Sequence, residues 1–142
     1  MILVDTNVIS EPLRKTPATH VVEWLNAQPI EILYLSAITV AELRFGVASL
    51  PTGKRRHRLH GNLGNRVLPL FAGRILPFDL SASQTYAELM NTARAAGMAI
   101  GAADGYIAAT AAANKMAVAT RDTAAFEAAG VPVINPWRQP QE

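Results

Sequence analysis

The chain opens with "MILVDTNVIS" at residues 1–10, where three apolar residues run directly into an aspartate. A short, wholly apolar run of this kind predicts a buried strand over residues 2–4. Asp5 then stands at the carboxyl end of that strand. In open parallel sheets, binding sites form outside the carboxyl ends of the strands, so Asp5 is the first candidate site residue.

Further apolar segments alternate with helical patterns along the rest of the chain. Strands are predicted at 31–36, 74–78, 116–120 and 131–135. Helices are predicted at 21–28, 37–50, 54–70, 83–97, 101–115 and 123–130. A capping box of Ser81 and Gln84 is expected to open the fourth helix. This alternation predicts an α/β fold with a parallel central sheet of about five strands flanked by helices, in a single domain over residues 1–142.

The composition excludes several classes of protein and site. The 142 residues include no cysteine, which excludes a disulfide framework, a thiolate nucleophile and a cysteine zinc site. No apolar run approaches the roughly 18 residues of a membrane-spanning helix. The N-terminus lacks the basic region and long apolar region of a signal peptide. We therefore expect no membrane partner and a cytoplasmic location.

Four of the eleven acidic residues stand where the edge of a sheet could collect them. Asp5 and Asp122 follow predicted strands, and Glu42 and Asp104 lie near the starts of predicted helices. Each has an ordinary structural explanation when it is taken alone. Asp5 and Asp122 could cap helices, and Asp104 could favour a helix N-terminus through the dipole. Glu42 could complete a capping box with Thr39.

The spacing of neighbouring apolar residues favours a shared role for the four acids. Asp104 lies three residues before Ile107, on an apolar stripe of its helix. Glu42 lies three residues before Phe45, again on an apolar stripe. A carboxylate in such a position is unfavourable unless it is paired. One divalent cation would satisfy the four acids together, and oxygen ligands select Mg²⁺ or Mn²⁺.

The segment "GKRRHRLH" at 53–60 concentrates basic side chains in an otherwise nearly neutral chain. Its lysine and arginines are Lys54, Arg55, Arg56 and Arg58. One interpretation is a solvated face of a helix or loop. The other is a contact with a polyanion, because basic clusters of this kind bind nucleic-acid phosphates.

Four sequence blocks around the acids resemble the signature blocks of the PIN-domain ribonucleases. These blocks are "DTNVIS" at 5–10, "AELRFG" at 41–46, "AADGYIAATA" at 102–111 and "ATRDTAAF" at 119–126. More narrowly, almost the whole chain is similar to the toxins of type II toxin–antitoxin modules, the VapC family and its FitB branch. The resemblance implies that the catalytic and metal-binding quartet is Asp5, Glu42, Asp104 and Asp122. It also implies a catalytic contribution from Thr120, and less directly from Thr6 and Asn7.

The same resemblance implies an Mg²⁺- or Mn²⁺-dependent endoribonuclease that hydrolyses RNA phosphodiester bonds. Such a toxin is a homodimer, and a cognate antitoxin covers its acidic groove and inhibits it. DNA binding is then expected only through the antitoxin. An acidic site repels RNA at long range unless basic groups stand nearby, so we expect a guiding role for Lys54, Arg55, Arg56 and Arg58.

Other functions fit the residues less well. A dinucleotide-binding protein would carry a glycine-rich phosphate loop after the first strand, and none follows residues 2–4. A haloacid-type phosphatase would carry a second acid in the "DTN" motif at 5–7. The remaining alternative is a non-catalytic subunit of a DNA-binding autorepressor complex, with residues 53–60 as its reading segment. EDTA-sensitive cleavage of RNA, compared with binding of operator DNA by the chain alone, distinguishes the two functions.

Overall fold

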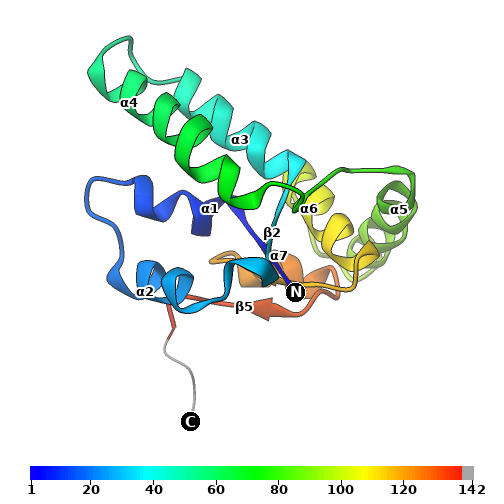
Figure 1. Cartoon of the computed structure of the whole chain (residues 1–142). Coiled ribbons are helices and arrows are strands. Elements are labelled where there is room, and N and C mark those ends of the chain that lie inside the picture. The colour runs from blue at the N-terminus through cyan, green and yellow to red at the C-terminus, as the bar shows by residue number, and fades with distance from the viewer. Residues whose placement is uncertain (139–142) are drawn as a thin grey trace.

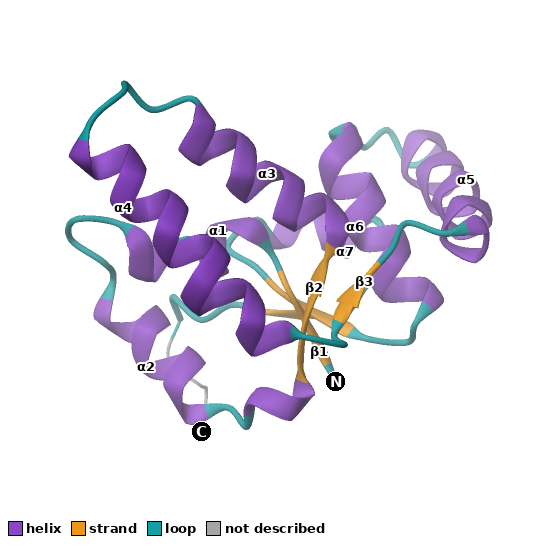
Figure 2. Cartoon of the chain, turned by 45° about the horizontal axis from the view of Figure 1, so that its top comes forward, coloured by secondary structure: helices purple, strands orange, loops and turns teal. Residues whose placement is uncertain are grey.

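A five-stranded sheet forms the centre of the computed structural model, which describes residues 1–138 (Figure 2). The strand order is β3-β2-β1-β4-β5, and all neighbouring strands are parallel. Their bounds are β1 Ile2–Val4, β2 Leu33–Ser36, β3 Ile75–Leu76, β4 Ala117–Ala119 and β5 Val133–Ile134. The predicted α/β fold with a parallel sheet of about five strands is confirmed. The strand that opens the chain is the central one.

Helices cover both faces of this sheet (Figure 1). The bounds of those on one face are α1 Thr6–Ile9, α2 Thr19–Ala27, α3 Ala37–Ala48 and α4 Lys54–Asn62. Those on the other face are α5 Leu80–Ala95, α6 Ala102–Ala113 and α7 Thr123–Ala128. Side chains alternate along a strand, so Ile2 and Val4 pack with the first group and Leu3 with the second. None of the helices described is long and apolar enough to cross a membrane.

Short helical turns between these elements were not predicted. They are α1 itself and two 3-10 turns at Glu11–Leu13 and Ile30–Ile32. A single turn is too short to show a helical repeat in the sequence. The predicted strand at 31–36 is correspondingly shorter, because its first residues form the second of these 3-10 turns.

The predicted helix over 54–70 is regular only in its first half. α4 ends at Asn62 and continues as a π-helical turn, Leu63–Val67, and a 3-10 turn, Leu68–Phe71. The segment includes Gly61, Gly64 and Pro69, which are the weakest helix-forming residue types. The backbone therefore stays helical over this stretch but changes its pitch twice.

The start of α5 differs from the prediction. Asp79 is the N-cap residue, and its Oδ1 atom accepts a hydrogen bond of 2.9 Å from the backbone N–H of Ala82. Ser81 lies inside the first turn, where its carbonyl oxygen accepts from the Thr85 hydroxyl. The predicted capping box of Ser81 and Gln84 is therefore wrong. Aspartate is itself a favourable N-cap residue.

Two features of the helices place the functional groups. α5 and α6 approach closely at Gly105, where a Cβ atom would lie 2.9 Å from both Met90 Sδ and Tyr86 Cε2. Glycine at this position therefore lets α6 pack closely against α5. This packing holds the first turn of α6, which carries Asp104, in place. On the opposite face, α3 and α4 pack side by side as a hairpin whose connecting loop projects from the body (Figure 1).

Candidate catalytic site

Four carboxylates come together at the carboxyl edge of the sheet. Asp5 follows β1 directly, and Asp122 lies just beyond β4. Glu42 is carried by α3, which continues from β2, and Asp104 by the first turn of α6. The charges of all the other three acids act on the pKa of Asp104, and those of Glu42 and Asp122 act on the pKa of Asp5. The structure therefore brings together the four acids that the sequence singled out.

Asp5 is the buried member of this group, with 3% of its surface exposed. Its Oδ1 atom accepts a hydrogen bond from the backbone N–H of Thr6 at 2.8 Å, which caps α1. Its Oδ2 atom accepts one from the Thr120 hydroxyl at 2.8 Å. Burial raises the pKa of Asp5, and the charges of Glu42 and Asp122 act in the same direction, whereas the two hydrogen bonds oppose them. The helix-capping explanation of Asp5 is thus correct, and it holds together with a place in the cluster.

Thr120 links two of the acids. Its side chain is fully buried and donates to Asp5, and its Oγ1 atom also accepts a hydrogen bond of 2.9 Å from the backbone N–H of Asp122. Asp122 occupies the N-cap position of α7, but its own side chain makes no capping hydrogen bond. The capping explanation of Asp122 is therefore wrong. One buried hydroxyl fixes the carboxylate after β1 relative to the loop after β4.

A second threonine holds Glu42. The Thr6 hydroxyl donates a hydrogen bond of 2.7 Å to Glu42 Oε1 and lies 3.2 Å from the Thr39 hydroxyl. The N-cap of α3 is Ser36, whose Oγ atom accepts from the backbone N–H of Ile38. The alternative of a capping box between Thr39 and Glu42 is therefore wrong. Thr39 is a supporting residue of the site that the sequence reasoning missed, because its position three residues before Glu42 suggested a cap instead.

The apolar-stripe argument holds for one carboxylate and fails for another. Asp104 is partly buried, and Ile107 on its side of α6 is completely buried. Glu42 is exposed, and Phe45, on the stripe that was expected to be buried, has 74% of its surface exposed. α3 is apolar around much of its circumference, so its sequence does not reveal which side faces solvent.

Asp104 has the most perturbed acidity of the group. Burial, a hydrogen bond with the Asp122 carboxyl and the charges of the other acids raise its pKa from 3.8 to about 7. At neutral pH, Asp104 of the chain alone is therefore protonated for a substantial part of the time. The leading influences on the Asp5 and Asp104 pKa values include no cation. The neighbouring charges that act on these two carboxyl groups are all negative.

The donor chemistry of this cluster fits a hard divalent cation, because the four carboxylates supply only oxygen ligands. As the side chains stand, no three Asp, Glu or His residues within 1–138 are grouped tightly enough to surround one ion. The hydrogen bonds from Thr6 and Thr120 hold two carboxylates in fixed orientations. The assignment of metal ligands stays a prediction.

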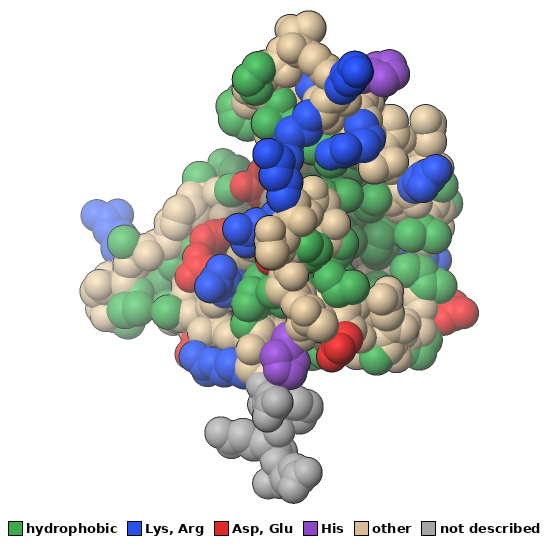
Figure 3. Space-filling view, turned by 90° about the vertical axis from the view of Figure 1, so that its left-hand side faces the viewer, with side chains coloured by type: hydrophobic (Ala, Val, Ile, Leu, Met, Phe, Trp, Pro, Cys, Tyr) green, Lys and Arg blue, Asp and Glu red, His purple; other side chains and the backbone are tan. Residues whose placement is uncertain are grey.

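The basic segment lies apart from the carboxylate cluster. Its residues begin α4 at the projecting end of the α3–α4 hairpin, with Lys54 and Arg58 exposed and Arg55 and Arg56 partly buried. In the space-filling view, Lys and Arg side chains form a band that runs from this hairpin down the face of the molecule, alongside exposed acidic groups (Figure 3). The segment is thus continuous with a basic surface and is not a part of the acidic site.

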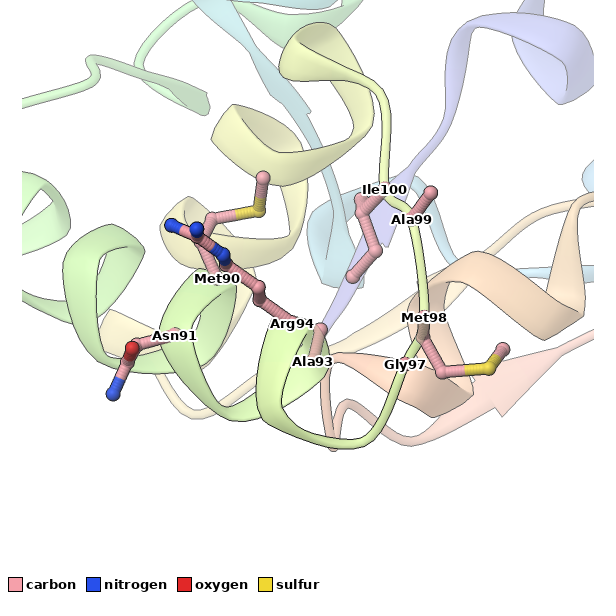
Figure 4. A pocket seen from close by; sticks show the side chains of 8 residues that line it. All are labelled: Met90, Asn91, Ala93, Arg94, Gly97, Met98, Ala99 and Ile100. Atoms are coloured by element: carbon pink, nitrogen blue, oxygen red, sulfur yellow. The ribbon is translucent and has the colours of Figure 1, made fainter.

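A separate pocket of about 590 Å³ lies between the end of α5 and the loop that leads to α6 (Figure 4). Its lining is mostly apolar, with Met90, Met98 and Ile100 contributing large side chains and Arg94 the one charged group. None of the four clustered acids lines it. This pocket therefore takes no part in the chemistry that the acids support.

Comparison with known proteins agrees with this architecture. The PIN-domain family pattern matches residues 2–131. A VapC ribonuclease, Y4jK of Sinorhizobium fredii, is 61% identical over 137 residues, covering 96% of this chain and 98% of the relative. Toxin FitB of Neisseria gonorrhoeae is 58% identical and covers 96% of this chain and 99% of the relative. A solved structure of FitAB bound to an IR36 DNA fragment superposes with a TM-score of 0.97 at 56% identity, over 99% of both chains.

Proposed function

The chain belongs to the PIN-domain family, within its VapC and FitB toxins, and we propose on that basis that it is an endoribonuclease toxin. It hydrolyses phosphodiester bonds of RNA with the help of Mg²⁺ or Mn²⁺, and a cognate antitoxin inhibits it. The observation that carries the proposal is the cluster of four carboxylates, in which the Thr120 hydroxyl joins Asp5 to Asp122, the two members furthest apart in the sequence. We assign the whole of residues 1–142 to this single domain and expect it to act in the cytoplasm.

The metal would be held by Asp5, Glu42, Asp104 and Asp122. When bound, it supplies a Lewis acid that lowers the pKa of water and offsets charge on the phosphate. The chain's own part is to orient these carboxylates. Thr120 and Thr6 orient Asp5 and Glu42 through hydrogen bonds of 2.8 and 2.7 Å. Asp104, whose pKa is raised to about 7, must lose its proton when the metal binds, because only ionised carboxylates are strong oxygen ligands.

Substrate binding is assigned to the basic band of Figure 3. Lys54, Arg55, Arg56 and Arg58 stand at its hairpin end, where their charges attract the RNA backbone without entering the acidic cluster. Phosphate contacts of this kind carry affinity but no base recognition. The proposal therefore leaves the choice of RNA sequence to other parts of the surface.

The chain's exposed apolar groups support association with protein partners. Phe45 on α3, Leu80 at the start of α5 and Met98 after α5 have 74%, 88% and 45% of their surfaces exposed. We assign such surfaces to a homodimer contact and to the antitoxin. The solved FitAB structure contains a DNA fragment, and we assign DNA binding in the corresponding complex of this chain to the antitoxin.

The decisive experiment measures RNA cleavage by the purified chain with Mg²⁺, with Mn²⁺ and with EDTA. We expect cleavage only with a divalent cation, and loss of cleavage in the Asp122→Asn variant. A control variant, Asp79→Asn, removes the charge of an acid that only caps α5 and should keep full activity. Metal-independent cleavage, or equal activity of Asp122→Asn and the wild type, would contradict the proposal.

A further inference from the structure

One basic residue lies in the loop that presents Asp122 and has no role in the proposed chemistry. Arg121 lies between Thr120 and Asp122 and is exposed to solvent. Its backbone N–H donates a hydrogen bond of 3.2 Å to the side-chain oxygen of Asn7, which follows β1. The residue is thus anchored to the same two strand ends that present Asp5 and Asp122.

The side chain of Arg121 is held by an aromatic ring. Its guanidinium carbon lies 5.1 Å from the centre of the Trp137 ring, within the range of a cation–π contact. β5 pairs with β4, and Thr120 N–H donates to Ile134 O, so the chain beyond β5 passes beside the end of β4. Trp137 therefore reaches Arg121 from the neighbouring strand of the same edge.

The ring is a fixed platform. Trp137 is partly buried and packs against the hydrophobic core that includes Ile2, Val4 and Val8. Its backbone N–H donates a hydrogen bond of 3.0 Å to Asn135 Oδ1. A guanidinium that stacks on such a ring uses only its face, and its N–H groups stay in the plane and point outward.

Those N–H groups have no partner within residues 1–138, where no ion pair or side-chain hydrogen bond engages the Arg121 guanidinium. Arg14 offers a contrast, because its guanidinium lies 3.2 Å from Glu11 Oε1 and forms an ion pair with it. Arg121 contributes only a minor part of the lowered pKa of Glu11, behind the hydrogen bonds from Ala18 and Arg14. Its main chemistry is therefore not the neutralisation of Glu11.

We propose that Arg121, held on the ring of Trp137, binds a backbone phosphate of the RNA strand beside the four carboxylates. A planar guanidinium matches two phosphate oxygens at once, and preorganisation by the ring reduces the ordering that binding requires. The contact anchors the strand next to the cluster, and it would act on any RNA sequence. This inference rests on the proposed ribonuclease function.

The test compares Arg121→Gln, Trp137→Leu and the double variant with the wild type in steady-state cleavage of a labelled single-stranded RNA. We expect kcat/KM to fall about tenfold in Arg121→Gln, as for the loss of one charge-assisted contact. In Trp137→Leu, kcat/KM should fall by a smaller factor. In the double variant it should fall no further than in Arg121→Gln, because the ring acts through the guanidinium. The matched control is Arg94→Gln, an arginine of the pocket in Figure 4, which should cleave like the wild type.

Two further measurements separate this inference from a structural role. Calorimetric Mn²⁺ binding should be unchanged in Arg121→Gln, and the decrease of RNA affinity with salt should become shallower. Arg121→Lys keeps the charge but not the planar fork, so it should restore the salt dependence more than kcat/KM. Wild-type kcat/KM in Arg121→Gln, with a lowered melting temperature, would overturn the inference and leave Arg121 as a partner of Glu11. Additive losses in the double variant would overturn the role of Trp137.

RNA binding with Ca²⁺ in place of Mg²⁺ keeps the two proposals distinguishable. If the wild type binds RNA without cleaving it under any metal, the ribonuclease proposal fails, and weaker binding by Arg121→Gln would still support the phosphate site. If the wild type cleaves and Arg121→Gln binds and cleaves equally well, the phosphate site fails alone.

Discussion

The carboxylate edge and the α3–α4 hairpin are both charged, but they are built in opposite ways. At the edge, Asp5 is buried and each of its oxygens accepts a hydrogen bond, one from the adjacent Thr6 backbone and one from Thr120, 115 residues away, so its orientation is fixed. On the hairpin, Lys54 and Arg58 are exposed on a helix face. The first region depends on geometry and the second on net charge. Substitutions that keep the shape should therefore harm the edge strongly and the hairpin only weakly.

The substitution with the largest expected effect on the carboxylate edge is Asp5→Asn. The amide is nearly isosteric but cannot act as an anionic ligand, so we expect cleavage activity to fall at least about 100-fold. The burial that raises the pKa of Asp5 also disfavours its charge, so the variant should fold in the absence of metal. Activity assays and calorimetric Mn²⁺ titration check both parts, and equal metal binding by the two proteins would contradict the assignment.

A smaller but more diagnostic effect is expected from Thr120→Val, which keeps the shape of the side chain. It removes the hydrogen bonds to Asp5 Oδ2 and from Asp122 N–H, so the two acids lose their common orientation. We expect an activity loss of about 10- to 100-fold and a stability loss of about 1–3 kcal/mol. The matched control is Thr110→Val, a fully buried threonine whose hydroxyl bonds only the helix carbonyl of Tyr106. A comparable loss of activity in both variants would mean that Thr120 serves packing alone.

Substitutions on the hairpin should affect RNA binding only through the loss of positive charge. Replacing the exposed Lys54 and Arg58 together by Gln should raise KM about three- to tenfold, leave kcat unchanged and reduce the salt dependence of RNA binding. Arg55 and Arg56 are partly buried, so their replacement would mix charge with packing. The exposed Arg66, beyond α4, provides the control as Arg66→Gln. An unchanged KM and salt slope would assign the hairpin to solvent or to a protein partner.

The smallest expected effect is a dependence of the melting temperature on pH, which comes from the carboxylate edge and not from the hairpin. The pKa of Asp104 is raised to about 7 by burial, by Asp122 and by the other acids, so the folded chain binds a proton more tightly than the unfolded chain. The resulting stabilisation is complete below the ordinary pKa of 3.8 and is lost as the pH rises through about 7. In EDTA, the melting temperature should therefore fall by a few degrees between pH 5.5 and 8.

Asp104→Asn should flatten this decline, and Mn²⁺ should raise the melting temperature of the wild type more at pH 8 than at pH 5.5. The Glu11 carboxyl has a lowered pKa and so contributes stability that is lost only at more acidic pH, below its ordinary value of 4.5. Measurements above pH 5.5 therefore report on Asp104 without a contribution from Glu11. An equal dependence of the melting temperature on pH in the two proteins would contradict the raised pKa of Asp104.

The sequence predicted the fold well because its signals are local. Short apolar runs marked the strands, and the alternation with helices implied a parallel sheet. It also identified the four acids, through their places after strands and through the resemblance of their blocks to a known family. One failure has a clear physical cause. α3 is apolar around much of its circumference, so Glu42 was expected on a buried stripe and is in fact exposed beside Phe45.

The supporting hydrogen bonds were beyond prediction for a different reason. Thr6 meets Thr39 and Glu42 across 33 and 36 residues, and Thr120 meets Asp5 across 115 residues. Helix and strand periodicities describe neighbours a few positions apart, so no local pattern reports such pairs. The order of the strands was equally hidden, because β1 pairs with β4, near the other end of the chain.

The pairing of β1 with β4 also determines when, during synthesis, the carboxylate cluster can form. The ribosome produces β1 first and β4 some 115 residues later, which takes about 6 to 23 s at typical rates of synthesis. Until then Asp5 lacks the Thr120 hydroxyl, and Asp122 does not exist. A nascent chain that has not reached β4 therefore lacks the complete carboxylate cluster. Because the four acids come together only after β4 has been synthesised, an antitoxin made at the same time has an opportunity to bind before the first RNA is cut.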